Sequence, residues 1–150
     1  MKANDIEQAF TNSIAAEKHS SKFYVQLKSY TDDEQTASLF QKMADQEIEH
    51  ARKLEQQWAS LTGKQLIGFP NQNMEYVETV PVWKEASDIS YVEALNIARD
   101  AEEQAVLYYG AFAEQAEGEV ADFFNALVKE EQMHANWIEG LISKHAVGNK

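Results

Sequence analysis

Four stretches of this sequence share one unusual pattern, a helical stripe of core-type residues with a glutamate in the middle. Residues spaced alternately three and four apart lie on one face of an α-helix, and each stripe has aromatic or aliphatic residues on both sides of its glutamate. The pattern predicts four helices, at residues 4–30, 33–61, 91–116 and 119–145. The expected fold class is all-α, with the four helices packed as a bundle.

Two of these helices have N-terminal capping signals. In a capping box, a Ser or Thr accepts a hydrogen bond from the backbone N–H three residues later, where a Glu reaches back. The motifs are Thr31-Asp32-Asp33-Glu34 and Ser90-Tyr91-Val92-Glu93. Between the second and third helices, the segment Thr62–Ser90 contains both prolines and lacks a sustained helical period. This segment predicts a long crossover connection, since its residues span a helix of about 39 Å with slack.

The length and charge of the chain limit its function. A chain of 150 residues, 44% of them hydrophobic, predicts one soluble domain over residues 1–150. Its 25 acidic residues against 13 Lys and Arg give a net charge of −12, which repels nucleic-acid phosphates and anionic lipid surfaces. We therefore expect no nucleic-acid partner and no membrane partner. The first residues lack the apolar core of a signal peptide, so the expected location is cytoplasmic.

The sequence contains no cysteine. Without cysteine the chain forms no disulfide, thiolate nucleophile, iron–sulfur cluster or Cys-type zinc site. Any bound metal must therefore be held by histidine and carboxylate groups.

The second half of the sequence repeats the first. At an offset of 85 residues the aligned pairs are Ala16-Glu17 with Ala101-Glu102 and Phe23-Tyr24 with Tyr108-Tyr109. At an offset of 84 residues the aligned motifs are Glu47-x-x-His50 and Glu131-x-x-His134. The repeat predicts two similar helical hairpins.

The glutamates at the centres of the stripes predict a metal site. A buried ionised carboxylate is strongly unfavourable without compensating positive charge, and no Lys or Arg lies near the middle of these stripes. Residues three apart lie one turn apart on a helix, so each Glu-x-x-His places a carboxylate and an imidazole together. Glu from two helices and Glu-x-x-His from two others form the ligand set of di-iron and di-manganese bundles. The predicted ligands are Glu17, Glu47, His50, Glu102, Glu131 and His134.

Two metal ions per chain are expected, iron or manganese, because carboxylate and imidazole ligands suit both metals. In the arrangement we favour, Glu47 and Glu131 bridge the ions, Glu17 and His50 bind one ion, and Glu102 and His134 bind the other. The sequence leaves open the alternative pairing of these last four ligands. Glu103 is the main rival to Glu102 as a ligand, and the repeat favours Glu102.

Other polar and aromatic residues near these motifs have two interpretations. Tyr24 and Tyr109 follow their glutamates by seven residues, two turns along the same face, from which a phenol reaches a metal-bound carboxylate. The alternative is a core aromatic role. Surface positions are expected for His19 and His145, which lack a preceding Glu at that spacing, and for Glu49 and Glu130. Packing roles are expected for Trp58, Trp83 and Trp137.

With these motifs the sequence resembles the rubrerythrin-like branch of the ferritin-like superfamily. The similarity covers nearly the whole chain and rests on the Ala-Glu pairs, the aromatic pairs and the two Glu-x-x-His motifs of the repeat. The resemblance implies a ferritin-like four-helix bundle with a long crossover, a non-haem di-iron centre and frequent homodimerisation. It also implies redox chemistry with hydrogen peroxide or dioxygen.

Two features depart from full-length rubrerythrins. Those proteins carry a Cys-rich rubredoxin-like domain that delivers electrons, whereas this chain has no cysteine. Electrons are therefore expected from an external donor protein. Rubrerythrins also have an extra Glu three residues after the ligand of the third helix, where this sequence has Ala105. In that family this extra Glu is associated with the movement of an iron ion during peroxide reduction, and this sequence lacks it at Ala105.

The leading expectation is an oxidoreductase that reduces hydrogen peroxide or activates dioxygen at a metal pair, with Tyr24 and Tyr109 donating hydrogen bonds or protons. A second hypothesis is a ferritin-like iron-handling protein that oxidises Fe(II). A third is a bundle whose metal site is only structural.

Overall fold

The computed structural model describes residues 3–63 and 89–148. Within them the chain forms four long helices and no strand, which confirms the all-α prediction. They are α1 (Ala3–Leu27), α2 (Glu34–Thr62), α3 (Tyr91–Gln115) and α4 (Gly118–Gly148), with a 3-10 turn, η1 (Lys28–Tyr30), after α1. The predicted crossover at Thr62–Ser90, with Pro70, Pro81 and Trp83, lies almost wholly outside the described residues.

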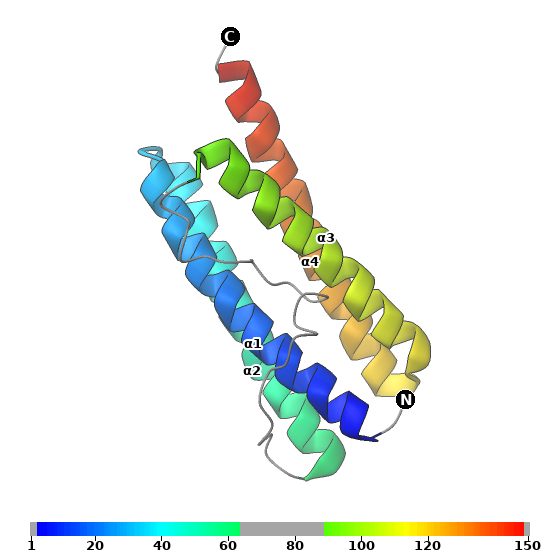
Figure 1. Cartoon of the computed structure of the whole chain (residues 1–150). Coiled ribbons are helices and arrows are strands. Elements are labelled where there is room, and N and C mark those ends of the chain that lie inside the picture. The colour runs from blue at the N-terminus through cyan, green and yellow to red at the C-terminus, as the bar shows by residue number, and fades with distance from the viewer. Residues whose placement is uncertain (1–2, 64–88, 149–150) are drawn as a thin grey trace. The chain divides into compact units, whose positions relative to one another are not determined.

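The chain divides into two compact units, Met1–Thr79 (unit 1) and Val80–Lys150 (unit 2). Each unit contains one pair of long helices that pack along each other, as the repeat predicts (Figure 1). The expectation of a single domain over residues 1–150 stays a prediction. None of the helices in the described part of the chain has the length and apolar character needed to cross a bilayer.

The hairpin of unit 1 is closed by contacts at both of its ends. The rings of Phe10 on α1 and Trp58 on α2 lie 5.4 Å apart, and toward the turn Lys28 Nζ donates a hydrogen bond of 2.7 Å to Gln41 Oε1. Between these contacts, large apolar side chains such as Phe40 and Leu54 are fully buried. Burial of this kind stabilises a helix pair more than helix propensity does.

The start of α2 differs from the predicted capping box. The N-cap is Asp33, whose carboxylate accepts hydrogen bonds from the backbone N–H of Thr36 at 2.9 Å and from its hydroxyl at 2.6 Å. Thr31 Oγ1 instead accepts from the N–H of Asp33 at 3.1 Å. The prediction of Thr31 as the cap was wrong because the neighbouring carboxylate, with two donors from Thr36, is the stronger acceptor. At its other end α2 stops at Gly63, which takes the left-handed conformation at φ 70°.

The hairpin of unit 2 begins as predicted and has an aromatic core. Ser90 caps α3 by accepting a hydrogen bond of 3.2 Å from the N–H of Glu93, which confirms the second capping signal. The rings of Phe112 and Phe124 stack at 4.9 Å, and Tyr109 stacks on Phe124 at 6.0 Å. Farther along the pair, Arg99 of α3 bonds to a glutamate of α4. These contacts fix the two helices of unit 2 in register.

Candidate metal centre

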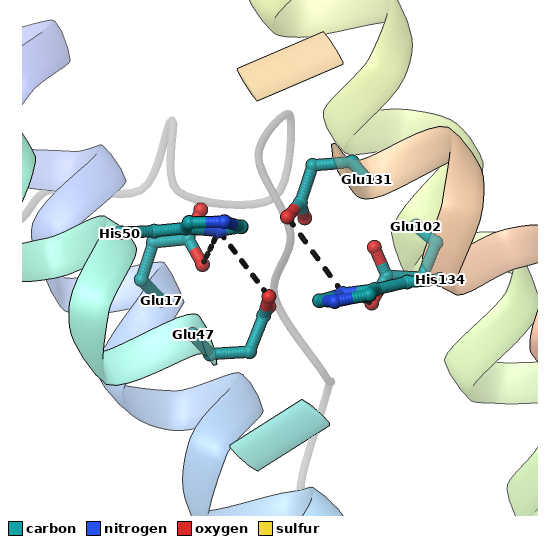
Figure 2. Close-up of polar contacts among 6 residues, drawn as sticks. All are labelled: Glu17, Glu47, His50, Glu102, Glu131 and His134. Carbon is teal, nitrogen blue, oxygen red and sulfur yellow. Dashed lines mark ion pairs between the residues drawn. The ribbon is translucent and has the colours of Figure 1, made fainter. Parts of the chain in front are cut away.

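Unit 1 brings together three of the predicted ligands, Glu17 from α1 and Glu47 and His50 from α2. The Nδ1 atom of His50 lies 3.4 Å from Glu17 Oε2 and 3.4 Å from Glu47 Oε1, and Figure 2 shows both carboxylates turned toward the imidazole. The side chains are at most 1% exposed. We call this triad half-site 1.

Unit 2 contains the matching triad, Glu102 from α3 and Glu131 and His134 from α4. The Nδ1 atom of His134 lies 3.3 Å from Glu102 Oε1 and 3.8 Å from Glu131 Oε1, the latter contact being marked in Figure 2. All three side chains are fully buried. We call this triad half-site 2.

The local fold explains why each triad forms. Within α2 and α4 the Glu-x-x-His spacing places the carboxylate and the imidazole on the same face, one turn apart. In each hairpin the remaining glutamate sits on the neighbouring helix at the level of this histidine. Periodicity along one helix and register between two helices are therefore both needed to assemble a half-site.

The spacing of the polar atoms fits a shared cation. The four separations of 3.3–3.8 Å exceed an ordinary hydrogen bond of about 3.0 Å. One possible ligand atom from each residue of a triad lies within 4.8 Å of the corresponding atoms of the other two. Ligands bound at about 2.0–2.2 Å to one ion lie at most about 4.4 Å apart, so each triad needs only small movements to bind one metal ion.

The electrostatics of half-site 1 also favour a cation. Burial, followed by the negative charge of Glu47, raises the pKa of Glu17 from 4.5 to about 8, against the opposing effect of His50. No lysine or arginine is buried in the part of the chain that the structure describes. A divalent ion would supply the missing positive charge and would displace the Glu17 proton.

The raised pKa of Glu17 predicts how the stability of the metal-free protein depends on pH. Between pH 4.5 and about 8 the unfolded chain has lost the Glu17 proton while the folded protein retains it. Because the native state then binds more protons, the free energy of unfolding should fall as the pH rises through this range. Urea denaturation at several pH values should show this fall, and a shallower slope in Glu17→Gln.

Glu49→Gln is the matched control for this measurement. Arg52 Nε donates a hydrogen bond of 2.9 Å to Glu49, and this contact lowers the pKa of Glu49. The stabilisation by Glu49 is therefore complete above pH 4.5 and is lost only as the pH drops further. It adds no pH dependence in the range where Glu17 acts. An unchanged slope in Glu17→Gln would contradict the assignment of the pH dependence to Glu17.

The remaining sequence candidates divide clearly by position. Glu103 is exposed, whereas Glu102 lies in the triad. Glu49 and Glu130 are half-buried outside the triads, and His19 is exposed as expected. Tyr24 and Tyr109 are at most 2% exposed; their catalytic role stays a prediction.

One residue near the site was not identified from the sequence. Trp137, expected only to pack, lies with its ring 5.6 Å from the imidazole of His134 at an interplanar angle of 29°. The two residues are three apart on α4, a spacing that allows contact but does not reveal a stacked orientation. The sequence feature that could have indicated this contact is the position of Trp137, one helical turn beyond the predicted ligand His134.

The fold and the triads define a class of helical protein with buried clusters of carboxylates and histidines that could hold a metal ion. A family model described as Rubrerythrin matches residues 9–96 and 93–150. The chain belongs to the rubrerythrin family. A comparison with curated proteins finds no match.

Two solved structures have a similar fold. One is a hypothetical protein from Pyrococcus furiosus, with 19% identity and a TM-score of 0.74, covering 95% of this chain and 92% of its own. The other is an uncharacterized conserved protein from Magnetospirillum magnetotacticum MS-1, with 22% identity and a TM-score of 0.68, covering 93% and 94%. With the family match, these similarities show a ferritin-like four-helix-bundle fold.

Proposed function

We propose that this protein is a non-haem di-iron oxidoreductase that reduces hydrogen peroxide at a carboxylate-bridged metal pair. The observation that carries the proposal is the presence, in a chain of the rubrerythrin family, of two buried Glu-Glu-His triads of matching composition. Such a ligand set suits iron or manganese. The family favours iron.

In this proposal each half-site holds one metal ion, and the reduced ions supply two electrons to peroxide. The reaction takes up two protons and yields two molecules of water. The carboxylates offset the charge of the ions, while the imidazoles of His50 and His134 complete the ligand sets. The buried phenols of Tyr24 and Tyr109 are proposed to donate hydrogen bonds or protons to the oxygen atoms.

Each turnover then requires two electrons from outside the chain. The sequence contains no cysteine for an iron–sulfur or dithiol carrier. We therefore propose a separate electron-donor protein as the partner, acting on a cytoplasmic homodimer.

The proposal is tested by metal analysis followed by rapid mixing. After anaerobic reconstitution the protein should hold about two iron ions per chain, and peroxide should oxidise them faster than dioxygen does. Glu47→Ala and Glu131→Ala should lose metal, whereas Glu49→Ala, which changes a half-buried residue of α2 outside the triads, should retain it. Slower oxidation by peroxide than by dioxygen would exclude the peroxidase. Repeated oxidation of added Fe(II) would instead identify iron handling.

A further inference from the structure

The two half-sites have the same ligands but different surroundings, which has a consequence for metal binding. Building on the proposed function, we propose that half-site 2 binds its metal ion more tightly than half-site 1, and that Trp137 is a positioning residue for half-site 2. Half-site 2 then fills first and retains its ion, while half-site 1 holds the exchangeable ion.

The first difference is the aromatic ring beside the ligand histidine. The indole of Trp137 stacks on the imidazole of His134, with centroids 5.6 Å apart and planes 29° apart. This contact limits rotation of the imidazole, whose Nδ1 already lies 3.3 Å from Glu102. A ligand held in its binding orientation loses less conformational entropy when the metal binds.

The repeat supplies the comparison for this contact. At the offset of 84 residues that aligns the two Glu-x-x-His motifs, the counterpart of Trp137 is Lys53. Lys53 is half-buried one turn beyond His50. Half-site 1 therefore has a cationic residue at the sequence position where half-site 2 has a stacking ring, and a like charge one helical turn away is less favourable to a bound cation than a neutral ring.

The second difference is charge. At the offset of 85 residues, Lys18 next to Glu17 corresponds to Glu103 next to Glu102. Over the whole units, unit 1 has 8 Lys and Arg against 12 Asp and Glu, and unit 2 has 5 against 13. The formal charges are thus −4 and −8. The greater negative charge of unit 2 attracts divalent cations, an effect that salt weakens.

The test is a stepwise titration of the metal-free protein with Mn(II) alone, followed by calorimetry or by counting free Mn(II). Wild type should bind one tight and one weaker equivalent, with affinities about tenfold or more apart. His50→Ala should keep the tight equivalent, whereas His134→Ala should lose it. Glu17→Gln and Glu102→Gln form a second matched pair of similar shape, with helix content checked by circular dichroism.

The role of Trp137 is tested with two substitutions. Trp137→Phe keeps a flat ring on the imidazole and should bind the first equivalent within about threefold of wild type. Trp137→Leu removes the ring and should weaken that equivalent about tenfold, with the second equivalent unchanged. In 0.5 M salt the contribution of surface charge to the Mn(II) affinity should shrink. The difference in affinity between Trp137→Phe and Trp137→Leu should remain.

The order of filling has a spectroscopic readout that does not depend on activity. With Trp58 and Trp83 replaced by Phe, Trp137 is the remaining tryptophan of the three in the chain. With less than one equivalent of Co(II), the fluorescence of Trp137 should be quenched in His50→Ala as in the background carrying the two Trp→Phe changes, and much less in His134→Ala. Equal quenching in the two histidine variants would overturn the order.

Failure of this inference is distinguishable from failure of the proposed function. Two equal affinities, or retention of the tight equivalent in His134→Ala, would overturn unequal binding even if peroxide is reduced. Unequal binding in a protein that does not react with peroxide would leave the inference supported and exclude the peroxidase. Absence of any bound metal would exclude both the unequal binding and the proposed peroxide reduction.

Discussion

Loading the metal-free protein with two equivalents of Fe(II) under anaerobic conditions should raise its thermal unfolding midpoint by at least about 10 °C. An ion that binds only the folded state stabilises it by about 4 kcal/mol when its concentration is a thousandfold above its dissociation constant. For a chain of this size each kcal/mol corresponds to about 2–4 °C. We expect a large shift because the ions should bind to two buried triads of glutamate and histidine side chains.

Glu131→Gln should make the protein more stable than wild type without metal and less stable than wild type with Fe(II). In the metal-free protein it replaces a fully buried carboxylate by a neutral side chain of the same shape, which can keep the contact with His134. The variant should therefore be more stable than wild type by about 1–3 kcal/mol at pH 8.5. With Fe(II) its midpoint should rise much less than that of wild type. Scanning calorimetry with and without metal measures both quantities.

Glu130→Gln is the control, because Glu130 is the neighbouring half-buried residue outside the triad. It should respond to Fe(II) as wild type does. If Glu131→Gln were instead less stable than wild type without metal, the carboxylate would be stabilising the fold by contacts with the protein itself. The proposed metal site would then lose its main electrostatic argument.

The positions of the helices and of the triads were predictable because they depend on a repeated period. A stripe that carries Glu47 and His50 three residues apart has only one face to present to its neighbouring helix. The structure buries both residues and adds Glu17 from α1. The repeat then indicated Glu102 rather than Glu103, and the structure places Glu102 in the second triad.

Other features depend on competition between close alternatives. At the start of α2, Thr31 and Asp33 both carry an oxygen suited to capping, and the hydroxyl of Thr36 gives Asp33 the advantage. The 3-10 turn at Lys28–Tyr30 is a similar case. It connects the end of α1 to the residues that cap α2, and its hydrogen bonds differ from those of an α-helix by a single residue in spacing. One-dimensional periodicity does not rank such alternatives, because they differ by single hydrogen bonds.

The stacking of Trp137 on His134 was not predictable for a different reason. The helical period places the two residues near each other, but the rotamers of both side chains decide whether the rings stack. Leu61 shows the limit at a helix end. It lies at helical spacing from the buried Leu54 and Trp58, yet the structure leaves it 48% exposed in the last turn of α2. Side-chain orientation and helix ends therefore limited the sequence-based predictions.

Phe124→Ala should cost about 3–5 kcal/mol of unfolding free energy, the usual range for removing a buried phenylalanine. The ring of Phe124 is 2% exposed and stacks on Phe112 at 4.9 Å and on Tyr109 at 6.0 Å. Its removal leaves a cavity between α3 and α4 and deprives two other rings of their partner. Urea denaturation of the metal-free protein measures the loss, and Leu107→Ala is the control, because Leu107 is 67% exposed on α3.

The same variant shows whether aromatic packing and metal binding are independent. Phe124 precedes Glu131 by seven residues, two turns along one face of α4. Its stacking partner Tyr109 is proposed to act on the oxidant and not to hold the metal ion, so the ring contributes no ligand to half-site 2. Distant sites contribute additively within about 0.5 kcal/mol. The stabilisation by Fe(II) should therefore be the same in Phe124→Ala as in wild type. A smaller stabilisation would mean that the stacked rings also hold the ligands of half-site 2 in place, and a loss of less than about 1 kcal/mol without metal would contradict the packing itself.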